Sequence, residues 1–239
     1  MNAQRFANPL FVALDTPDLG HALELSKAVR PYVGGLKIGL EFISAHGPAG
    51  MREIAALGLP VFADVKFHDI PNTVAGAARE ISALNVAVFN VHASGGADMM
   101  RAAKEAAASV DPKVKVIAVT VLTSVADQDL RTIGQGDSVA LQVERLARLA
   151  REAGLDGVVC SPREIEVVRR ACGSEFLIVT PGVRPAGTAL ADQRRVTTPL
   201  EAVRAGADVL VIGRPITAAA DPVAAARVIA EEVAPARAA

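Results

Sequence analysis

The chain has 239 residues, of which 51% are hydrophobic and 21% are charged, and its formal net charge at pH 7 is -1. This composition is typical of a soluble globular protein with a large core, and a near-neutral chain with no Trp, one Tyr and seven Phe gives no support for a nucleic-acid partner. No apolar run is long enough to cross a bilayer, and residues 1–8 lack the pattern of a signal peptide. We therefore expect a cytoplasmic protein without a membrane partner.

Cysteine and histidine are too sparse and too irregularly spaced to indicate a metal centre. The only cysteines are Cys160 and Cys172, and the four histidines follow no ligand-type spacing. The sequence therefore predicts small, buried, reduced thiols, and it gives no reason to expect a bound metal or another cofactor.

Eight runs rich in Val, Ile and Leu alternate with Ala-rich amphipathic segments along the chain. The expected strands are residues 10–15, 35–39, 60–67, 86–92, 114–122, 157–160, 176–180 and 208–212. Helical periodicity is expected over residues 19–33, 41–57, 71–84, 97–110, 138–153 and 162–171. This alternation predicts an α/β fold, a (β/α)8 TIM barrel in which residues 1–239 form a single catalytic domain with short flexible termini. An open doubly wound sheet is the weaker alternative, because no GxGxxG pattern follows the first strand.

Charged residues gather where the first three expected strands end. They are Asp15, Lys37, Asp64, Lys66 and Asp69. Barrel enzymes carry their active sites at the carboxyl ends of the strands, so this grouping favours a catalytic interpretation. In a regular strand Asp64 and Lys66 point to the same face, about 7 Å apart. A structural ion pair is the alternative for the DxK pattern on its own, and Asp15 could instead cap a helix.

A second group lies after the last two expected strands, in the segments TPGVRP (180–185) and IGRP (212–215). These loops commonly hold phosphate in a barrel, since glycine lets backbone N–H groups approach the oxygens and arginine adds charge. Arg184 and Arg214 are therefore phosphate candidates, although Gly-Arg pairs also occur in ordinary turns. Residues 186–195 between them are long enough to form a lid. The other clustered basic residues are expected to be solvated: Lys113, Lys115, Arg169, Arg170, Arg194 and Arg195.

The run FADVKFHDIPNTV at residues 62–74 resembles the signature of the orotidine 5'-phosphate decarboxylase family. Further segments match that family in the same order: VALD (12–15), LKIG (36–39), VTVLTS (119–124), TPGVRP (180–185), DQRR (192–195) and IGRPI (212–216). The resemblance covers nearly the whole chain and shows no departure at a motif position. DxKxxD alone is shared with sister phosphosugar families, whereas DxKxHDIPNTV together with PGVRP is highly specific.

The resemblance implies that the chain removes CO2 from orotidine 5'-phosphate to form UMP in de novo pyrimidine biosynthesis, without a cofactor or a metal. Lys66 would protonate the ring carbon that loses the carboxylate. Lys37, Asp64 and Asp69 would complete a charged array around that carbon, with Asp69 supplied across the interface of a homodimer. Asp64 would act either by orienting the two lysines or by repelling the substrate carboxylate, and the sequence leaves both roles open.

The resemblance also implies a set of substrate contacts. Asp15 and Thr73 would hold ribose hydroxyls, and Lys37 would also touch the substrate. Thr123 would lie beside the pyrimidine, with Ser124 as a weaker candidate for a base contact. The residues implied at the 5'-phosphate are Arg184, Gln193, Gly213 and Arg214.

Three other functions are compatible with parts of the pattern. A Schiff-base aldolase needs a neutral lysine, whereas two carboxylates beside Lys66 would keep its ammonium charged. A metal-dependent phosphosugar enzyme of the sister families places a carboxylate where Lys37 stands. A non-catalytic phosphate-binding barrel needs the late arginines but not Lys66, and no sequence feature excludes it.

Overall fold

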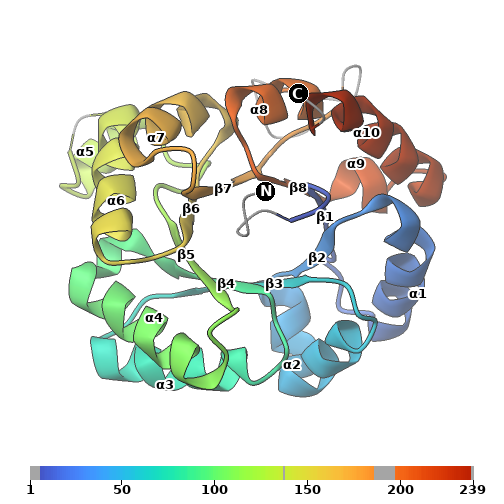
Figure 1. Ribbon diagram of the computed structural model, residues 1–239, viewed down its shortest axis with the longest axis horizontal. Coiled ribbons are helices and arrows are strands. Elements are labelled where there is room, and N and C mark those ends of the chain that lie inside the picture. The colour runs from blue at the N-terminus through green and yellow to red at the C-terminus, as the bar shows by residue number, and fades with distance from the viewer. Residues whose placement is uncertain (1–5, 137, 186–196, 238–239) are drawn as a thin grey trace.

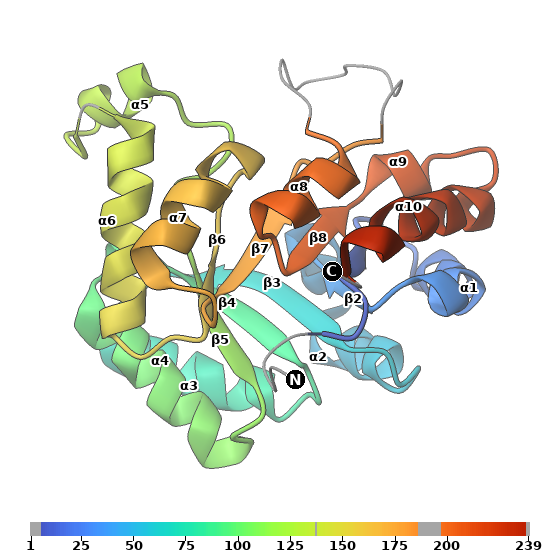
Figure 2. The same cartoon turned by 45° about the horizontal axis from the view of Figure 1, so that its top comes forward.

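The computed structural model describes residues 6–136, 138–185 and 197–237, and its eight parallel strands close into a barrel in sequence order. Helices surround the barrel on the outside, as the two views in Figure 1 and Figure 2 show. The strands are β1 Leu10–Ala13, β2 Gly35–Ile38, β3 Val61–Phe67, β4 Val88–His92, β5 Lys115–Val119, β6 Gly157–Val159, β7 Leu177–Pro181 and β8 Val209–Ile212. The predicted (β/α)8 TIM barrel is therefore confirmed, and the assignment of residues 1–239 to one domain stays a prediction.

Each strand leads into helical structure on the outside of the barrel. The α-helices are α1 Leu19–Val29, α2 Leu40–Ala55, α3 Pro71–Ser82, α4 Ala97–Val110, α5 Asp127–Thr132, α6 Val139–Glu152, α7 Ile165–Cys172, α8 Pro199–Ala205, α9 Arg214–Thr217 and α10 Pro222–Arg237. Short 3-10 helices cover η1 Arg30–Tyr32, η2 Ala93–Gly95 and η3 Pro162–Glu164. The helix α5 lies within the loop after β5, for which the sequence pattern predicts no helix.

The strands separate two apolar layers, because successive side chains of a strand point to opposite faces. The inner layer consists of Phe11, Ala13, Phe62, Val88, Ile117, Leu177, Val179, Val209 and Val211. The outer layer lies between strands and helices, and it includes Val12 of β1 and Phe89 of β4. Both cysteines are buried free thiols, as predicted. Since side chains fill the barrel interior, a ligand has room at the carboxyl ends of the strands.

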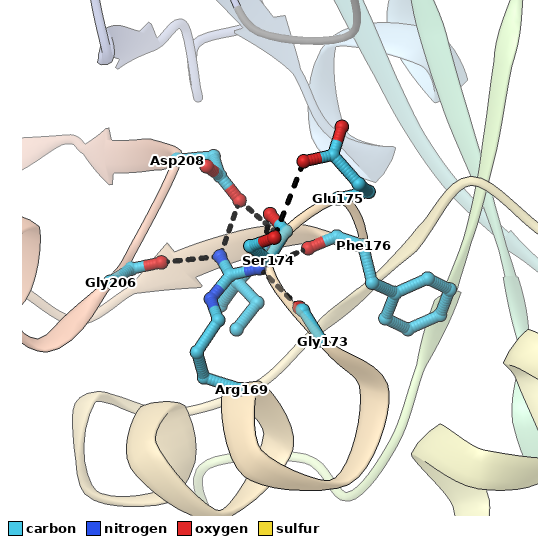
Figure 3. A network of polar contacts seen from close by, with 8 residues as sticks. Arg169, Gly173, Ser174, Glu175, Phe176, Gly206 and Asp208 are labelled. Carbon is cyan, nitrogen blue, oxygen red and sulfur yellow. Dashed lines mark hydrogen bonds and ion pairs between the residues drawn. The ribbon is translucent and has the colours of Figure 1, made fainter. Parts of the chain in front are cut away.

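The expectation that Arg169 is solvated is wrong. Figure 3 shows its guanidinium surrounded by oxygens near the amino ends of β7 and β8. Four of them are backbone carbonyl oxygens that accept hydrogen bonds, those of Gly173, Ser174, Phe176 and Gly206. The fifth is Asp208 Oδ2, which lies 2.7 Å from Arg169 Nη2 and also accepts from the N–H of Ile178 at 2.8 Å. Arg169 thus ties α7 to two strands, whereas Arg170 is exposed as predicted.

Asp156 plays a corresponding part immediately before β6. Its Oδ2 accepts a hydrogen bond from the N–H of Val116 in β5 at 2.8 Å and another from Lys104 Nζ of α4. Lys115 Nζ lies 3.7 Å from Asp156 Oδ1, so Lys115 is ion-paired and not simply solvated as expected. Asp156 and Asp208 therefore fasten neighbouring strands at the amino end of the barrel.

Candidate active site

Strand β3 does not keep the regular alternation expected from its sequence. Ala63 pairs with Phe89 of β4, and the next pair is Phe67 with Val91. Between these two pairs β3 advances by four residues, whereas β4 advances by two. The two additional residues form a bulge, which re-aims side chains at the end of the strand. Within it Lys66 has a φ of 52°, in the left-handed region that residues with a Cβ seldom adopt.

The bulge brings the charged side chains of β3 together. Lys66 Nζ donates a hydrogen bond to Asp64 Oδ1 at 2.6 Å. Lys37 Nζ, from the neighbouring strand β2, lies 3.5 Å from Asp64 Oδ2 and 2.8 Å from Oδ1 of Asp15, which follows β1. Four of the predicted residues thus form one row in which the charge alternates, Asp15, Lys37, Asp64 and Lys66. We call these four residues the charged row.

Burial differs along the charged row. The Lys37 side chain is 8% exposed and that of Asp64 is 15% exposed, whereas the side chains of Lys66 and Asp15 are 28% and 53% exposed. Burial by itself raises the pKa of Asp64, but the Lys37 and Lys66 ammonium groups and the hydrogen bonds that Asp64 accepts outweigh it and hold the pKa below its usual value. Asp64 is therefore ionised at neutral pH and interacts with both lysines.

A cavity of about 220 Å³ opens beside the charged row at the carboxyl ends of the strands. Lys37, Asp64 and Lys66 line one side of it. The rest of the lining is mostly apolar: Phe62, Val119, Val121, Leu122, Thr123, Val159, Cys160, Val179, Pro181 and Val211. An apolar slot with a few charges at one side suits a flat heterocycle that carries one reacting polar group. A larger hollow of about 370 Å³ lies at the opposite end of the barrel, around Cys172 and Phe176, away from these charges.

Two predicted residues of the β3–α3 segment do not line this cavity. Asp69 is exposed, and its Oδ1 accepts a hydrogen bond from the N–H of Ile70 at 2.6 Å. Among the described residues it forms no ion pair with Lys37 or Lys66. Thr73 is exposed in the first turn of α3. Asp69 therefore belongs neither to the charged row nor to the lining of this cavity within one chain.

The predicted phosphate residues lie on the loops after the adjacent strands β7 and β8. Arg184 is 8% exposed, and its backbone N–H donates to the carbonyl oxygen of Thr197 at 3.2 Å. Gly213 joins β8 to α9, and Arg214 is the exposed first residue of α9. Gln193 and the predicted lid over residues 186–195 lie outside the described residues.

The two residues predicted to lie beside the pyrimidine follow β5. Thr123 lines the cavity, and Ser124, the next residue, is exposed.

The model of the Orotidine 5'-phosphate decarboxylase / HUMPS family matches residues 8–229. The chain belongs to this family. The orotidine 5'-phosphate decarboxylase of Moorella thermoacetica is 59% identical to it, over 94% of this chain and 91% of the relative. That of Rhodospirillum rubrum is 55% identical, over 97% of this chain and 96% of the relative. The crystal structure of orotidine 5'-phosphate decarboxylase from Lactobacillus acidophilus matches with a TM-score of 0.82 at 36% identity, over 95% of this chain and 99% of that one.

This membership in the orotidine 5'-phosphate decarboxylase / HUMPS family confirms the resemblance that residues 62–74 predict. No helix in the described part of the chain is long and apolar enough to cross a membrane. Over residues 6–136, 138–185 and 197–237, no three side chains of His, Cys, Asp or Glu are grouped so that they could hold a metal ion.

One polar residue of this family member touches the charged row although the sequence pattern does not single it out. Asn90 of β4 is completely buried and contacts both Asp64 and Lys66. It is the third residue of the apolar run VFNVH, where spacing carries no signal of a site. Only its pairing opposite the β3 bulge reveals its position.

Proposed function

We propose that the chain decarboxylates orotidine 5'-phosphate to UMP and CO2, as a step of de novo pyrimidine biosynthesis, in the cavity beside the charged row. The observation that carries the proposal is the alternation of two ammonium and two carboxylate groups at the edge of an apolar slot, in a chain of this family. A cytoplasmic location and a single domain over residues 1–239 belong to the same proposal.

The reaction breaks the bond between an sp2 ring carbon and its carboxylate, and the electron pair of that bond stays on the ring carbon. No neighbouring carbonyl is placed to accept this charge, so the protein must stabilise it directly. The Lys66 ammonium does so by its charge and then transfers one Nζ proton to the carbon, which leaves a neutral amine. This sequence of steps includes no cofactor, because the lysine supplies both the charge and the proton.

Asp64 has an ordinary electrostatic function in this scheme. It contacts both lysines, through Oδ1 to Lys66 at 2.6 Å and through Oδ2 to Lys37 at 3.5 Å. A fixed anion between two cations orients both ammonium groups before substrate arrives. Repulsion of the substrate carboxylate by Asp64 is the second candidate role, and it requires no change in the positions of these groups.

We further propose that the active unit is a homodimer in which Asp69 enters the site of the partner. Asp69 is exposed, and it makes no ion pair with the charged row of its own chain. Large apolar side chains are also exposed on the segments after β2, β3 and β5: Leu40 is 53% exposed, Ile70 67% and Leu122 43%. These positions share the carboxyl end of the barrel, where a second copy would cover apolar surface and complete each site.

The proposed reaction is tested by following orotidine 5'-phosphate and released CO2 with the purified chain, with and without a chelator. We expect turnover that the chelator does not change, since Lys66 and not a metal stabilises the charge. Loss of activity with the chelator would favour a metal-dependent phosphosugar-type enzyme. Tight binding of UMP without any turnover would favour a non-catalytic phosphate-binding barrel.

Arg214→Ala is expected to weaken the binding of phosphorylated ligands. Removing one charge-assisted hydrogen bond to the 5'-phosphate costs about 1.5 to 3 kcal/mol, which raises the Kd of UMP roughly 10- to 150-fold. The binding of uridine, which lacks the phosphate, should change little. Titration calorimetry with both ligands measures this difference.

The matched control is Arg204→Ala, which removes another exposed arginine, near the end of α8. It should leave the Kd of UMP unchanged. If Arg214→Ala weakens uridine as much as UMP, Arg214 does not bind the phosphate.

A further inference from the structure

Asn90 is the only completely buried asparagine in the described part of the chain, and both ends of its amide are used. Its Oδ1 accepts a hydrogen bond from the backbone N–H of Lys66 at 2.7 Å. Its Nδ2 donates to Asp64 Oδ1 at 2.7 Å, the same oxygen that binds Lys66 Nζ. A backbone N–H can only donate and a carboxylate can only accept, so the amide has one possible orientation.

The position of Asn90 in β4 explains these contacts. Its neighbours Phe89 and Val91 pair with Ala63 and Phe67, the two residues that flank the bulge of β3. Asn90 therefore lies opposite the bulged residues 64–66, where the regular ladder between the strands is interrupted. Its side chain supplies the acceptor that the backbone ladder does not give to Lys66.

We infer that Asn90 is a positioning residue of the decarboxylation, which holds the β3 bulge so that the Asp64 carboxylate and the Lys66 ammonium meet in the cavity. This inference rests on the proposed function. Asn90 does not line the cavity, so it acts through Asp64 and Lys66 and not on the substrate.

The backbone of Lys66 shows why such support is needed. Its φ of 52° is unfavourable for a residue with a long side chain, and this conformation persists only when its surroundings hold it. The hydrogen bond from its N–H to Asn90 is the contact that fixes the peptide group there. Without that bond the bulge can relax, and a displacement of the ammonium by about 1 Å is enough to lower a rate on the order of 100-fold.

The amide also fixes the Asp64 carboxylate without adding charge. Asp64 faces Lys37 of β2 and Lys66 of its own strand. The charge of Asp64 also acts on the pKa of His92 in β4. The neutral amide of Asn90 donates one hydrogen bond to Asp64 Oδ1. It leaves the charges there unchanged, which are those of the Lys37 and Lys66 ammonium groups and of the Asp64 carboxylate. An aspartate in place of Asn90 would keep the acceptor for the Lys66 N–H but would set a second carboxylate against Asp64.

The first test is Asn90→Ala, with decarboxylation of orotidine 5'-phosphate and binding of UMP as separate measurements. We expect kcat to fall on the order of 100-fold, with KM and the Kd of UMP within about threefold of the parent. The control is Val91→Ala, which truncates the next buried residue of β4 on its opposite face. That variant should lose thermal stability through a cavity and keep kcat within about threefold of the parent.

The second test is the pH profile of Asn90→Asp. At about pH 8 the new carboxylate repels Asp64, so kcat should be as low as in the alanine variant. A pair of carboxyl groups at hydrogen-bond distance shares one proton with a raised pKa, and a protonated carboxyl group offers one acceptor and one donor, as the amide does. We therefore expect the kcat of Asn90→Asp to rise as the pH falls toward about 5, while that of Asn90→Ala does not.

Several results would overturn the inference. One is an Asn90→Ala enzyme with kcat within threefold of the parent, and another is an equal loss of kcat in Val91→Ala. A third is a pH profile of kcat for Asn90→Asp that is parallel to that of the parent. If the alanine variant does not fold, this pH profile decides the test. If the parent chain itself does not decarboxylate orotidine 5'-phosphate, the proposed function fails, which is a distinct result.

Discussion

Lys66→Ala is expected to lower kcat for orotidine 5'-phosphate by at least about 10⁴-fold, because one ammonium both stabilises the carbanion and supplies its proton. The affinity for UMP should change much less, since the ring carbon of the product carries no negative charge. The fold should survive, because Asp64 keeps its contacts with Lys37 and Asn90. Single-turnover kinetics and UMP titration measure the two effects separately.

The control for this substitution is Lys104→Ala. Lys104 has a side chain 25% exposed, close to the 28% of Lys66, and it is also paired with an aspartate, but at the amino end of the barrel. Its removal should reduce stability and leave kcat within about threefold of the parent. A kcat for Lys66→Ala within tenfold of the parent would contradict the assignment of Lys66 as the proton donor.

Mixing two inactive variants is expected to restore activity if Asp69 acts across the dimer interface. In a heterodimer of Lys66→Ala and Asp69→Ala chains, one site contains both lesions. The other has Lys66 from one chain and Asp69 from its partner, so it is intact. Random exchange of equal amounts makes about half of the dimers heterodimers, so roughly a quarter of the parent activity should return.

The control mixture combines Lys66→Ala with Lys37→Ala. Both residues belong to the charged row of a single chain, so each site of that heterodimer keeps one lesion and no activity should return. Heterodimers are counted by native mass spectrometry with one tagged chain. If the Asp69 mixture stays inactive while heterodimers are present, Asp69 acts within its own chain.

The barrel could be predicted because its strands are continuous apolar runs, which are typical of a parallel sheet with both faces buried. The charged row could be predicted because its members follow successive strands. The bulge could not, since Asp64 and Lys66 two residues apart are equally compatible with a regular strand. A bulge depends on pairing with β4, which is a contact between distant parts of the sequence.

The contacts of Arg169 and Asn90 could not be predicted from the sequence for the same reason. Arg169 precedes another arginine on a helix, and this pattern is typical of an exposed face, but its partner Asp208 is 39 residues away. Asn90 lies in an apolar run, and its partners Asp64 and Lys66 are on another strand. Local patterns predict the elements well, whereas polar contacts between elements need the assembled barrel.

The contacts of Arg169 and Asp208 have a consequence for how this chain tolerates change. They hold β7 and β8 at the amino end of the barrel, whereas the loops with Arg184 and Arg214 leave the same strands at the other end. Substitutions in those loops can alter which ligand is bound without loosening the strands that support them. The chain is therefore a suitable starting point for directed evolution, with diversity placed after β7 and β8 and the residues around Arg169 kept constant.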